Sequence, residues 1–422
     1  MRSDSEAGGT MQEGNRQMNV MTPASPGCTA PAIADLDTAP IPAAAYYDEN
    51  WFALEREAVF KRTWLHVGHI CELPQAGSYI VREIEVARAS IIIARGKDGV
   101  IRAFHNACTH RGTQLVAPGS SGRSPTFSCP YHMWTFGSDG RLLSAPDFER
   151  FYVDDKSQCD LPKVAVDVCA GLIFINLDPS PDQTLKEFLG AMGEMAETLP
   201  VAQATTFDEY VYEIDANWKV TFDNFQENYH LRFVHRRTNG APPLDSTPNP
   251  YNYPADYRSC GPHRMNTSPG GAPPDDKPKP LAFFLLGKLA EQVKADGLAG
   301  GPYERDYFIF FPNLYLFGNP RMHFTHLVMP LEAGKSRGVF RFYWNGEDRT
   351  ASEQLVREFA MSFAREIHTE DVEPLIAAQR GLNSGALKHV HFQEHEVLCR
   401  HLFHATDAAV QKYLAETGGQ AA

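Results

Sequence analysis

Hydrophobic side chains recur at helical spacing near the start of the folded region and again in the second half of the chain. From Asp48 to Lys61 large apolar residues return every three or four positions, and Asp48 or Asn50 could cap the first turn. The same spacing predicts helices over residues 184–199, 218–230, 351–380 and 394–416.

Short strand-like runs fill most of the remaining sequence. Between about residues 63 and 180 the runs YIVREI, ASIIIAR, VIRAF and GLIFINL are separated by turns such as Asp98-Gly99 and Asp139-Gly140, which predicts a small antiparallel β domain. Further strands are expected over 205–216, 306–317, 322–329 and 336–345. The stretch 240–280 is rich in Pro, Gly and Asn and predicts a long loop of the kind that often covers an active site.

Composition and charge narrow the class of protein. The 422 residues are 43% hydrophobic, enough for two or three domains with sizeable cores. The formal net charge is −13, so we expect neither nucleic acid nor an anionic membrane as a partner. No apolar run approaches the roughly 20 residues that span a bilayer.

The N-terminal sequence and the cysteine content bear on the location and the redox state of the protein. The start, MRSDSEAGGT, lacks the layout of a signal peptide, and we therefore expect a cytoplasmic protein. Residues 1–43 are rich in small and polar residues and are expected to form a disordered arm. Eight cysteines are sparse for this length, which favours reduced thiols with a subset used for metal.

Two segments in the β region carry the first candidate metal ligands. Cys108 and His110 lie in one segment, Cys129 and His132 lie in the other, and a nearby Gly or Pro favours a tight loop in each. Structural zinc usually takes paired Cys-x₂-Cys ligands, whereas two mixed loops suit a [2Fe–2S] cluster with Cys on one iron and His on the other. Zinc and simple packing remain the alternatives.

A second group of candidate ligands begins in the helix predicted at 218–230. Glu227 and His230 are three residues apart and share a helix face. His230 and His235 would point about 140° apart on a straight helix, so they can bind one metal only if the helix ends or distorts between them. Asp371 is the first choice and Glu370 the second for the carboxylate that completes a two-His, one-acid Fe(II) site. The alternative is a solvated acidic helix turn.

These residues resemble the α subunits of Rieske non-haem iron aromatic-ring-hydroxylating oxygenases, over the stretch from about Tyr46 to His404. The family pattern matches Cys108, His110, Cys129, His132, Asn217-Trp218-Lys219, Asn224, His230, His235, Asp371 and Gln379-Arg380-Gly381-Leu382. The resemblance implies an α+β fold. Its expected parts are an N-terminal helix at 44–62, an antiparallel Rieske [2Fe–2S] domain at 63–180, and a catalytic domain of helices and antiparallel sheet, of the helix-grip type, at 181–422.

The resemblance also implies an assembly. The family's bridging acid falls on Glu227, where many relatives carry Asp, and it is expected to link His230 to His132 of a neighbouring subunit. A homotrimer follows, with or without a β subunit. Relatives with Glu at this position include those that act on quaternary amines and N-alkyl groups.

The implied activity is that of a terminal oxygenase component, an O₂-dependent mono- or dioxygenase that hydroxylates a small aromatic or related organic substrate. The sequence has no Gly-x-Gly-x-x-Gly fingerprint, so NAD(P)H is expected to act through a separate flavin reductase, with or without a ferredoxin. Two alternatives stay open. The first is a monooxygenase that performs N- or O-dealkylation, and the second is an iron–sulfur electron carrier without oxygenase activity.

The substrate pocket is expected to be mostly apolar. Asn224 is expected either to line the site and help gate it or to satisfy helix backbone groups. The candidate pocket residues are Phe222, Phe233, Phe308, Phe310, Asn313, Tyr315 and Phe317, together with a lid around Tyr251–Tyr257.

Overall fold

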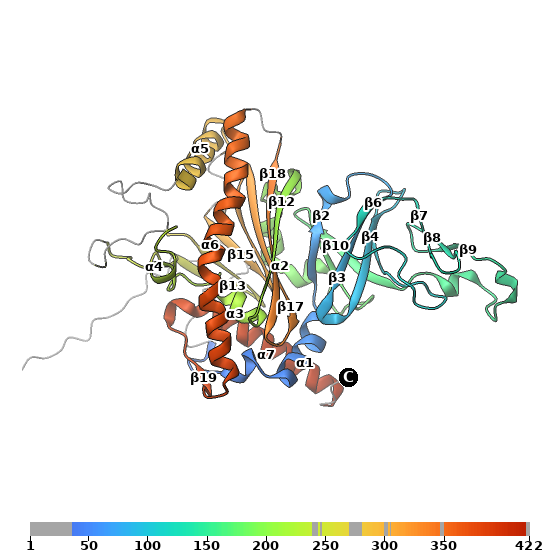
Figure 1. Cartoon of the computed structure of the whole chain (residues 1–422), viewed down its shortest axis with the longest axis horizontal. Coiled ribbons are helices and arrows are strands. Elements are labelled where there is room, and N and C mark those ends of the chain that lie inside the picture. Colours follow the sequence, from blue (N-terminus) through green and yellow to red (C-terminus); the bar gives the residue numbers. More distant parts are fainter. Residues whose placement is uncertain are drawn as a thin grey trace, which may run out of the picture.

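The structure is a computed structural model, and it describes residues 36–238, 244, 247–269, 281–298, 303, 305–346 and 350–418. Most of the arm expected at 1–43 therefore lies outside the described residues. The described chain forms two seven-stranded antiparallel sheets, with helices gathered on one of them, and two smaller sheets (Figure 1). None of the described helices is long and apolar enough to cross a lipid bilayer.

The first sheet comes from the region predicted to be a small β domain, and that prediction is confirmed. Its strand order is β2 (Leu65–His69), β11 (Leu172–Asn176), β10 (Lys163–Cys169), β5 (Ile101–His105), β4 (Ala89–Arg95), β3 (Ser78–Ile84) and β6 (Ser121–Arg123). A smaller sheet of β7 (Thr126–Ser128), β8 (Thr135–Gly137) and β9 (Leu142–Ser144) projects from it at one end of the molecule (Figure 1).

The second sheet is larger and includes the strands predicted in the second half of the chain. Its order is β12 (Ala204–Ile214), β18 (Lys335–Asn345), β17 (Met322–Glu332), β16 (Leu314–Asn319), β15 (Asp306–Phe310), β14 (His263–Thr267) and β13 (Asp256–Cys260). The prediction of an unbroken loop over 240–280 is wrong, because β13 and β14 form a hairpin inside it. These two strands are polar, and buried Arg258 is held there by the Asp306 carboxylate at 2.7 Å.

Most predicted helices are confirmed. They are α1 (Glu49–Glu55), continued by a π-helical turn (Arg56–Phe60), α2 (Leu185–Ala196), α6 (Ala351–Asn383) and α7 (Val397–Thr417). The Asp48 carboxylate caps α1 by accepting a hydrogen bond from the Trp51 backbone N–H at 2.8 Å. The helix α5 (Leu281–Ala295) was not predicted, since its apolar start gives no clear helical period.

The helix predicted over 218–230 is wrong in its extent. The structure has two short helices, α3 (Trp218–Asp223) and α4 (Leu231–Val234), with turns between them. The remaining short elements are β1 (Ile41–Pro42) paired with β19 (His389–Val390), and 3₁₀ turns at Ala43–Tyr46, Ile70–Glu72, Glu85–Ala87, Phe148–Arg150, Lys156–Cys159, Pro200–Gln203 and Glu394–Glu396.

The two faces of the second sheet bury separate cores. Successive side chains of a strand point to opposite faces. Ile309 and Tyr315 pack into the core shared with α3 and α6, whereas Phe308 and Phe310 pack into the core beneath α2. The helix α6 crosses the sheet as one long element (Figure 1). The face under α3 and α6 is therefore the one that can meet residues of both helices.

Charged pairs join the first sheet to the second. Arg341 on β18 donates to Glu72 of the β domain at 2.9 Å, and Arg337 on the same strand contacts Glu85 of that domain. Burial raises the pKa of the Glu72 carboxyl, but the Arg341 and Arg82 guanidinium groups hold it below its usual value overall. These contacts fix the β domain against the sheet that carries the helices.

A buried ion pair ties α3 to the N-terminal helix α1. The two Glu55 carboxylate oxygens accept hydrogen bonds from Lys219 Nζ at 2.6 Å and from Trp218 Nε1 at 2.9 Å. The side chains of Glu55 and Lys219 are 0% and 1% exposed, so each charge depends on the other. This pair fixes the first turn of α3, the helix that leads to Glu227 and His230.

Replacing Glu55 with Gln is expected to lower the free energy of unfolding by about 3–5 kcal/mol, because the Lys219 ammonium would stay buried without its counter-charge. Glu416→Gln is the matched control. It removes a carboxylate from a pair with Arg62 whose side chains are 42% and 45% exposed, and it should cost less than about 1 kcal/mol. Urea unfolding followed by tryptophan fluorescence measures both, and equal losses would contradict the importance of the buried pair.

Candidate metal centres

The two Cys/His segments form similar tight loops at the β7–β9 end of the molecule. In the first loop the Gly112 N–H donates to the Cys108 carbonyl at 2.7 Å, and in the second the Met133 N–H donates to the Cys129 carbonyl at 3.0 Å. Gly112 and Met133 both have positive φ, 79° and 57°, which turns each loop back on itself. The structure thus brings together all four residues predicted to hold a cluster.

The ring nitrogens of these loops fit a metal group. The Nδ1 atoms of His110 and His132 are buried and have no hydrogen-bond partner, which is uncommon unless another atom satisfies them. The two rings lie with their centroids 4.6 Å apart, and His110 stacks on Trp134 at 5.0 Å. Burial raises the pKa of the Cys129 thiol, but the N–H groups of Tyr131 and His132 at its sulfur lower it overall.

A single zinc ion fits these four residues poorly. Among the described residues, the only group of three or more Cys, His or acidic residues whose ligand atoms all lie within 4.8 Å of one another is His230, His235 and Asp371. Four ligands of one tetrahedral ion would converge more closely, since zinc bonds are about 2.0–2.3 Å long. Two irons bridged by sulfide, with the thiolates and the imidazoles on different irons, suit loop ligands that stay further apart.

The break between α3 and α4 brings the two later histidines together. His230 precedes α4 and His235 ends it with a non-helical backbone, φ −87° and ψ 47°. Their Nε2 atoms lie 3.3 Å apart, and Asp371 Oδ1 on α6 lies 3.7 Å from the first and 3.3 Å from the second. Ligands of one metal with bonds of about 2.1 Å are separated by similar distances.

The far side of each imidazole is held by a carboxylate. Glu227 Oε1 contacts His230 Nδ1, and Glu370 Oε2 lies 3.0 Å from His235 Nδ1. With Nδ1 protonated toward a carboxylate, the lone pair of each ring lies on Nε2 and faces the other histidine. Asp371 Oδ1 is buried and has no hydrogen-bond partner, so all three facing atoms are free to bind a cation.

Burial and neighbouring charges compete at these groups. Burial lowers the pKa of His230, but the hydrogen bond and the charge of Glu227 raise it above its ordinary value overall. Burial raises the pKa of the Asp371 carboxyl, and His235, His230 and the Asn224 amide oppose that effect. The Asn224 amide therefore faces the Asp371 carboxyl.

The predicted pocket residues do not all lie near these ligands. Phe222, Tyr315 and Phe317 lie on the face of the second sheet that meets α3 and α6, whereas Phe308 and Phe310 lie on the opposite face. Phe233 is 48% exposed on the surface, and the Asn313 amide is buried against the Val328 carbonyl at 2.7 Å. The expected lid Tyr251–Tyr257 lies close to α4, where Tyr251 packs near Tyr229 and Phe233.

Sequence reasoning missed a cluster of rings beside the candidate iron ligands. Phe225 lies 4.0 Å from the His326 ring, and the Tyr212 hydroxyl contacts His326 Nε2 at 2.7 Å. The Tyr212 ring packs at 3.7 Å against His368, which lies one turn before Asp371 on α6. Both residues lie in the core that α6 covers, but β17 is buried along nearly its whole length, so no alternation of polar and apolar residues marks His326 in the sequence.

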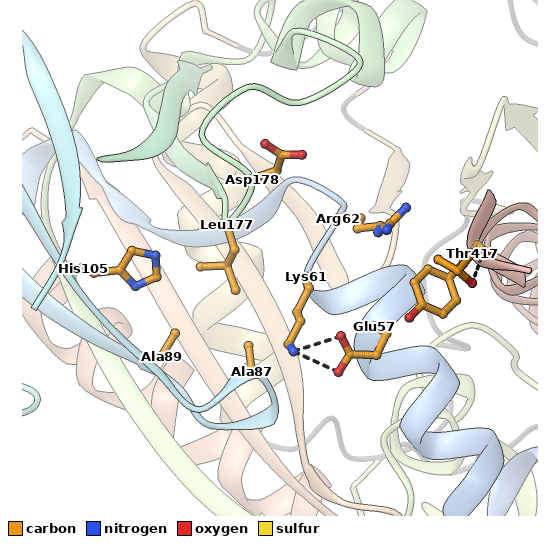
Figure 2. Close-up of a pocket in the computed structure, with 10 residues that line it drawn as sticks. Glu57, Lys61, Arg62, Ala87, Ala89, His105, Leu177, Asp178 and Thr417 are labelled. Atoms are coloured by element: carbon orange, nitrogen blue, oxygen red, sulfur yellow. Dashed lines mark hydrogen bonds and ion pairs between the residues drawn. The ribbon is translucent and has the colours of Figure 1, made fainter. Parts of the chain in front are cut away.

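A cavity of about 610 Å³ lies elsewhere, where the β domain meets the N-terminal turn and α7 (Figure 2). Figure 2 shows Lys61 pointing toward Glu57, and the ammonium lies 2.9 Å from each carboxylate oxygen. Arg62, also at the rim, pairs with Glu416 at 2.7 Å. The two cations at this cavity, Lys61 and Arg62, are therefore paired with carboxylates of the same chain. None of the candidate metal ligands lines the cavity.

Comparison with known proteins agrees with this geometry. Residues 63–164 match the Rieske [2Fe-2S] domain, and residues 201–412 match the ring hydroxylating alpha subunit (catalytic domain). The carnitine monooxygenase oxygenase subunit of Escherichia coli (strain K12) is 37% identical over 196 residues, which are 46% of this chain and 52% of that protein. The 2-aminobenzenesulfonate 2,3-dioxygenase subunit alpha of Alcaligenes sp is 36% identical over 199 residues, 46% of this chain and 50% of that protein.

The matched stretch thus spans about half the length of these relatives. Among solved structures, the quaternary ammonium Rieske monooxygenase CntA in complex with L-carnitine has a TM-score of 0.68 at 24% identity, over 90% of this chain and 97% of that one. This likeness establishes the fold.

The two domain matches define a protein in which a Rieske [2Fe-2S] domain is followed by a catalytic domain of mixed helix and antiparallel sheet. The chain belongs to the family of ring hydroxylating alpha subunits. The predicted α+β class and the resemblance drawn from the sequence are confirmed. The first domain implies a [2Fe–2S] cluster, and the second implies a mononuclear iron.

Proposed function

We propose that this chain is the terminal oxygenase component of a Rieske-type system, with its Rieske domain at 63–180 and its catalytic domain at 181–422. Cys108, His110, Cys129 and His132 would hold the [2Fe–2S] cluster, and His230, His235 and Asp371 would hold Fe(II). The observation that carries the proposal is the convergence of two imidazole nitrogens and one carboxylate oxygen within 4.8 Å of one another. Two His and one acid on one side of an iron leave positions open for O₂.

When bound, the cluster would supply single electrons and the mononuclear iron would supply O₂ activation. The chain's own residues prepare the site. Glu227 orients His230, and the Asn224 amide faces Asp371. Electrons would come from NAD(P)H through a separate reductase, with or without a ferredoxin.

Metal analysis of the purified chain is expected to give about three irons and two acid-labile sulfides per chain. Asp371→Ala should remove about one iron and leave both sulfides, because it deletes a ligand of the mononuclear site only. Cys129→Ser should remove the sulfides and leave about one iron. Zinc in the β-domain loops, or full activity in Asp371→Ala, would contradict the proposal, and the second result would favour a simple electron carrier.

For the substrate, we propose a small organic molecule with a quaternary ammonium or N-alkyl group. The name of the carnitine monooxygenase relative gives such a compound as its substrate. This chain also carries Glu227 at the bridging position. The rings of Phe225, Tyr212 and Tyr315 lie on the face that holds the iron ligands, and aromatic faces attract quaternary ammonium groups. Hydroxylation of a carbon next to nitrogen would let the product break into an amine and an aldehyde.

An aromatic substrate is the second candidate. The 2-aminobenzenesulfonate dioxygenase relative carries an aromatic compound in its name and matches this chain at 36% identity. The same rings would stack on an arene at offset or edge-to-face geometry.

A panel of a betaine, an aryl N-methyl compound and an arene acid, supplied with O₂, NADH and a reductase, is expected to give aldehyde from the nitrogen compounds. Phe225→Leu should raise KM for the betaine by about tenfold, because it removes a ring that faces the cation. Phe308→Leu is the matched control on the opposite face of the sheet and should leave KM unchanged. Turnover of the arene acid alone would refute the amine substrate but not the oxygenase class.

We also propose that the working unit is a head-to-tail ring, with a homotrimer as the expected size. Within one chain the cluster loops lie near β7–β9 and the candidate iron ligands near α4, at opposite ends of the molecule (Figure 1). Exposed apolar side chains mark both ends. Tyr131 and Met133 are 56% and 59% exposed beside His132, and Tyr229 and Phe233 are 44% and 48% exposed beside Glu227.

Such a ring gives Glu227 a second partner. Its Oε1 contacts His230 Nδ1, and its Oε2 accepts the His230 backbone N–H at 3.2 Å. Oε2 also accepts the Tyr229 backbone N–H, whereas Oε1 has a further lone pair, so Glu227 can also accept a hydrogen bond from His132 of the neighbouring copy.

Mixed rings test the cross-chain route. Chains with Cys129→Ser and chains with Asp371→Ala should each be inactive alone, but rings assembled from an equal mixture should recover about a quarter of the wild-type rate. The recovery follows because one of the three interfaces in each mixed trimer joins an intact cluster to an intact iron site. If mixed rings stay inactive while their assembly is verified by two affinity tags, the transfer occurs within one chain and the proposal is wrong.

A further inference from the structure

Glu370 lies one position before Asp371 on α6 and contacts the second histidine from behind. Its Oε2 lies 3.0 Å from His235 Nδ1, and the Thr238 hydroxyl donates a hydrogen bond to the same oxygen. Its Oε1 lies 3.6 Å from Arg237 Nε. The Glu370 side chain is 12% exposed, so these contacts form away from most of the solvent.

This arrangement separates Glu370 from the metal-facing atoms. Nδ1 and Nε2 lie on opposite sides of an imidazole ring, and His235 Nε2 faces His230 and Asp371. A carboxylate that holds Nδ1 cannot bind the same ion as Nε2. Of the two adjacent acids, Asp371 is therefore placed as a ligand and Glu370 is not.

We propose that Glu370 is a positioning residue for the mononuclear iron, an inference that rests on the proposed function of the His230, His235 and Asp371 group. Its carboxylate keeps the proton of His235 on Nδ1 and leaves the lone pair on Nε2 for the metal. Groups that hold the far nitrogen of a metal-binding histidine in this way commonly change metal affinity by about 10–100-fold when they are removed.

Thr238 helps to hold the Glu370 carboxylate in place. His235 ends α4 with a non-helical backbone, so the helix does little to fix its ring. The hydroxyl of Thr238 and the guanidinium of Arg237 hold the Glu370 carboxylate from the segment that follows His235. Glu370 thereby links that segment to α6, and it sets the position of His235 relative to Asp371.

The test measures iron rather than turnover. The full-length oligomer with its cluster loaded is prepared as wild type, Glu370→Ala, Glu370→Gln, Thr238→Val and Glu366→Gln. Release of the mononuclear Fe(II) to a chromophoric chelator gives its off-rate, and competition with the same chelator gives its Kd. Glu366 is the matched control, since it lies one turn earlier on α6 and pairs with the exposed Arg237 at 2.9 Å.

Glu370→Ala is expected to weaken Fe(II) binding by about 10–100-fold, with smaller losses in Glu370→Gln and Thr238→Val. Glu366→Gln should change it by less than about fivefold. The visible spectrum of the Co(II)-substituted site should change in Glu370→Ala and stay unchanged in Glu366→Gln, because only the first frees the His235 ring. A merely structural role would lower the unfolding midpoint without changing this spectrum.

Two results would overturn the inference while the proposed function stands. One is Fe(II) affinity in Glu370→Ala equal to that of Glu366→Gln. The other is complete loss of the iron in Glu370→Ala, as in Asp371→Ala, because Glu370 would then be a ligand. A wild-type chain that binds no iron beyond its cluster would overturn the proposed function itself.

Discussion

The catalytic domain depends on one geometric constraint, which is that two histidines five positions apart must direct their Nε2 atoms to the same point. A continuous helix would turn them about 140° apart. The chain meets the constraint by ending α3 at Asp223 and restarting as the short α4, so that His230 and His235 flank a single turn with Nε2 atoms 3.3 Å apart. The rest of the domain holds this interrupted segment in place.

Tertiary contacts stabilise the interruption where helix hydrogen bonds are missing. Buried Asp223, the last residue of α3, accepts hydrogen bonds from the Tyr46 hydroxyl at 3.1 Å and the Gln226 amide at 3.0 Å. Burial raises the pKa of the Asp223 carboxyl to about 7, against the opposing charges of Arg264 and Lys219. Both the N-terminal segment and the β14 strand, through Arg264 and Gln226, thus take part in shaping the turn.

Chemistry carried by a few residue types could be predicted from the sequence, but side-chain direction could not. The mixed Cys/His loops and the helix cap at Asp48 follow from local spacing and chemistry, whereas the choice of Asp371 over Glu370 rests on the family resemblance and stays a prediction. In contrast, the run Tyr307-Phe308-Ile309-Phe310 is apolar throughout, so its alternation gives no sign of which face meets α6. The residue at which α3 ends could not be predicted from local sequence either, because it depends on contacts with Tyr46 and Arg264, which are distant in the chain.

The charge of the assembled group is consistent with the cation proposed for it. Three carboxylates, Glu227, Glu370 and Asp371, surround two imidazoles in a largely buried place. Burial and, to a smaller extent, the charge of Glu370 raise the pKa of the Asp371 carboxyl above its ordinary value, and His235, His230 and Asn224 oppose that effect in part. A divalent ion between the imidazoles and Asp371 would offset the cost of burying the Asp371 carboxylate. It would also attract Glu227 and Glu370, which lie on the far sides of the two imidazole rings. In the proposed function, the energy of metal binding would therefore offset part of the cost of gathering these like charges.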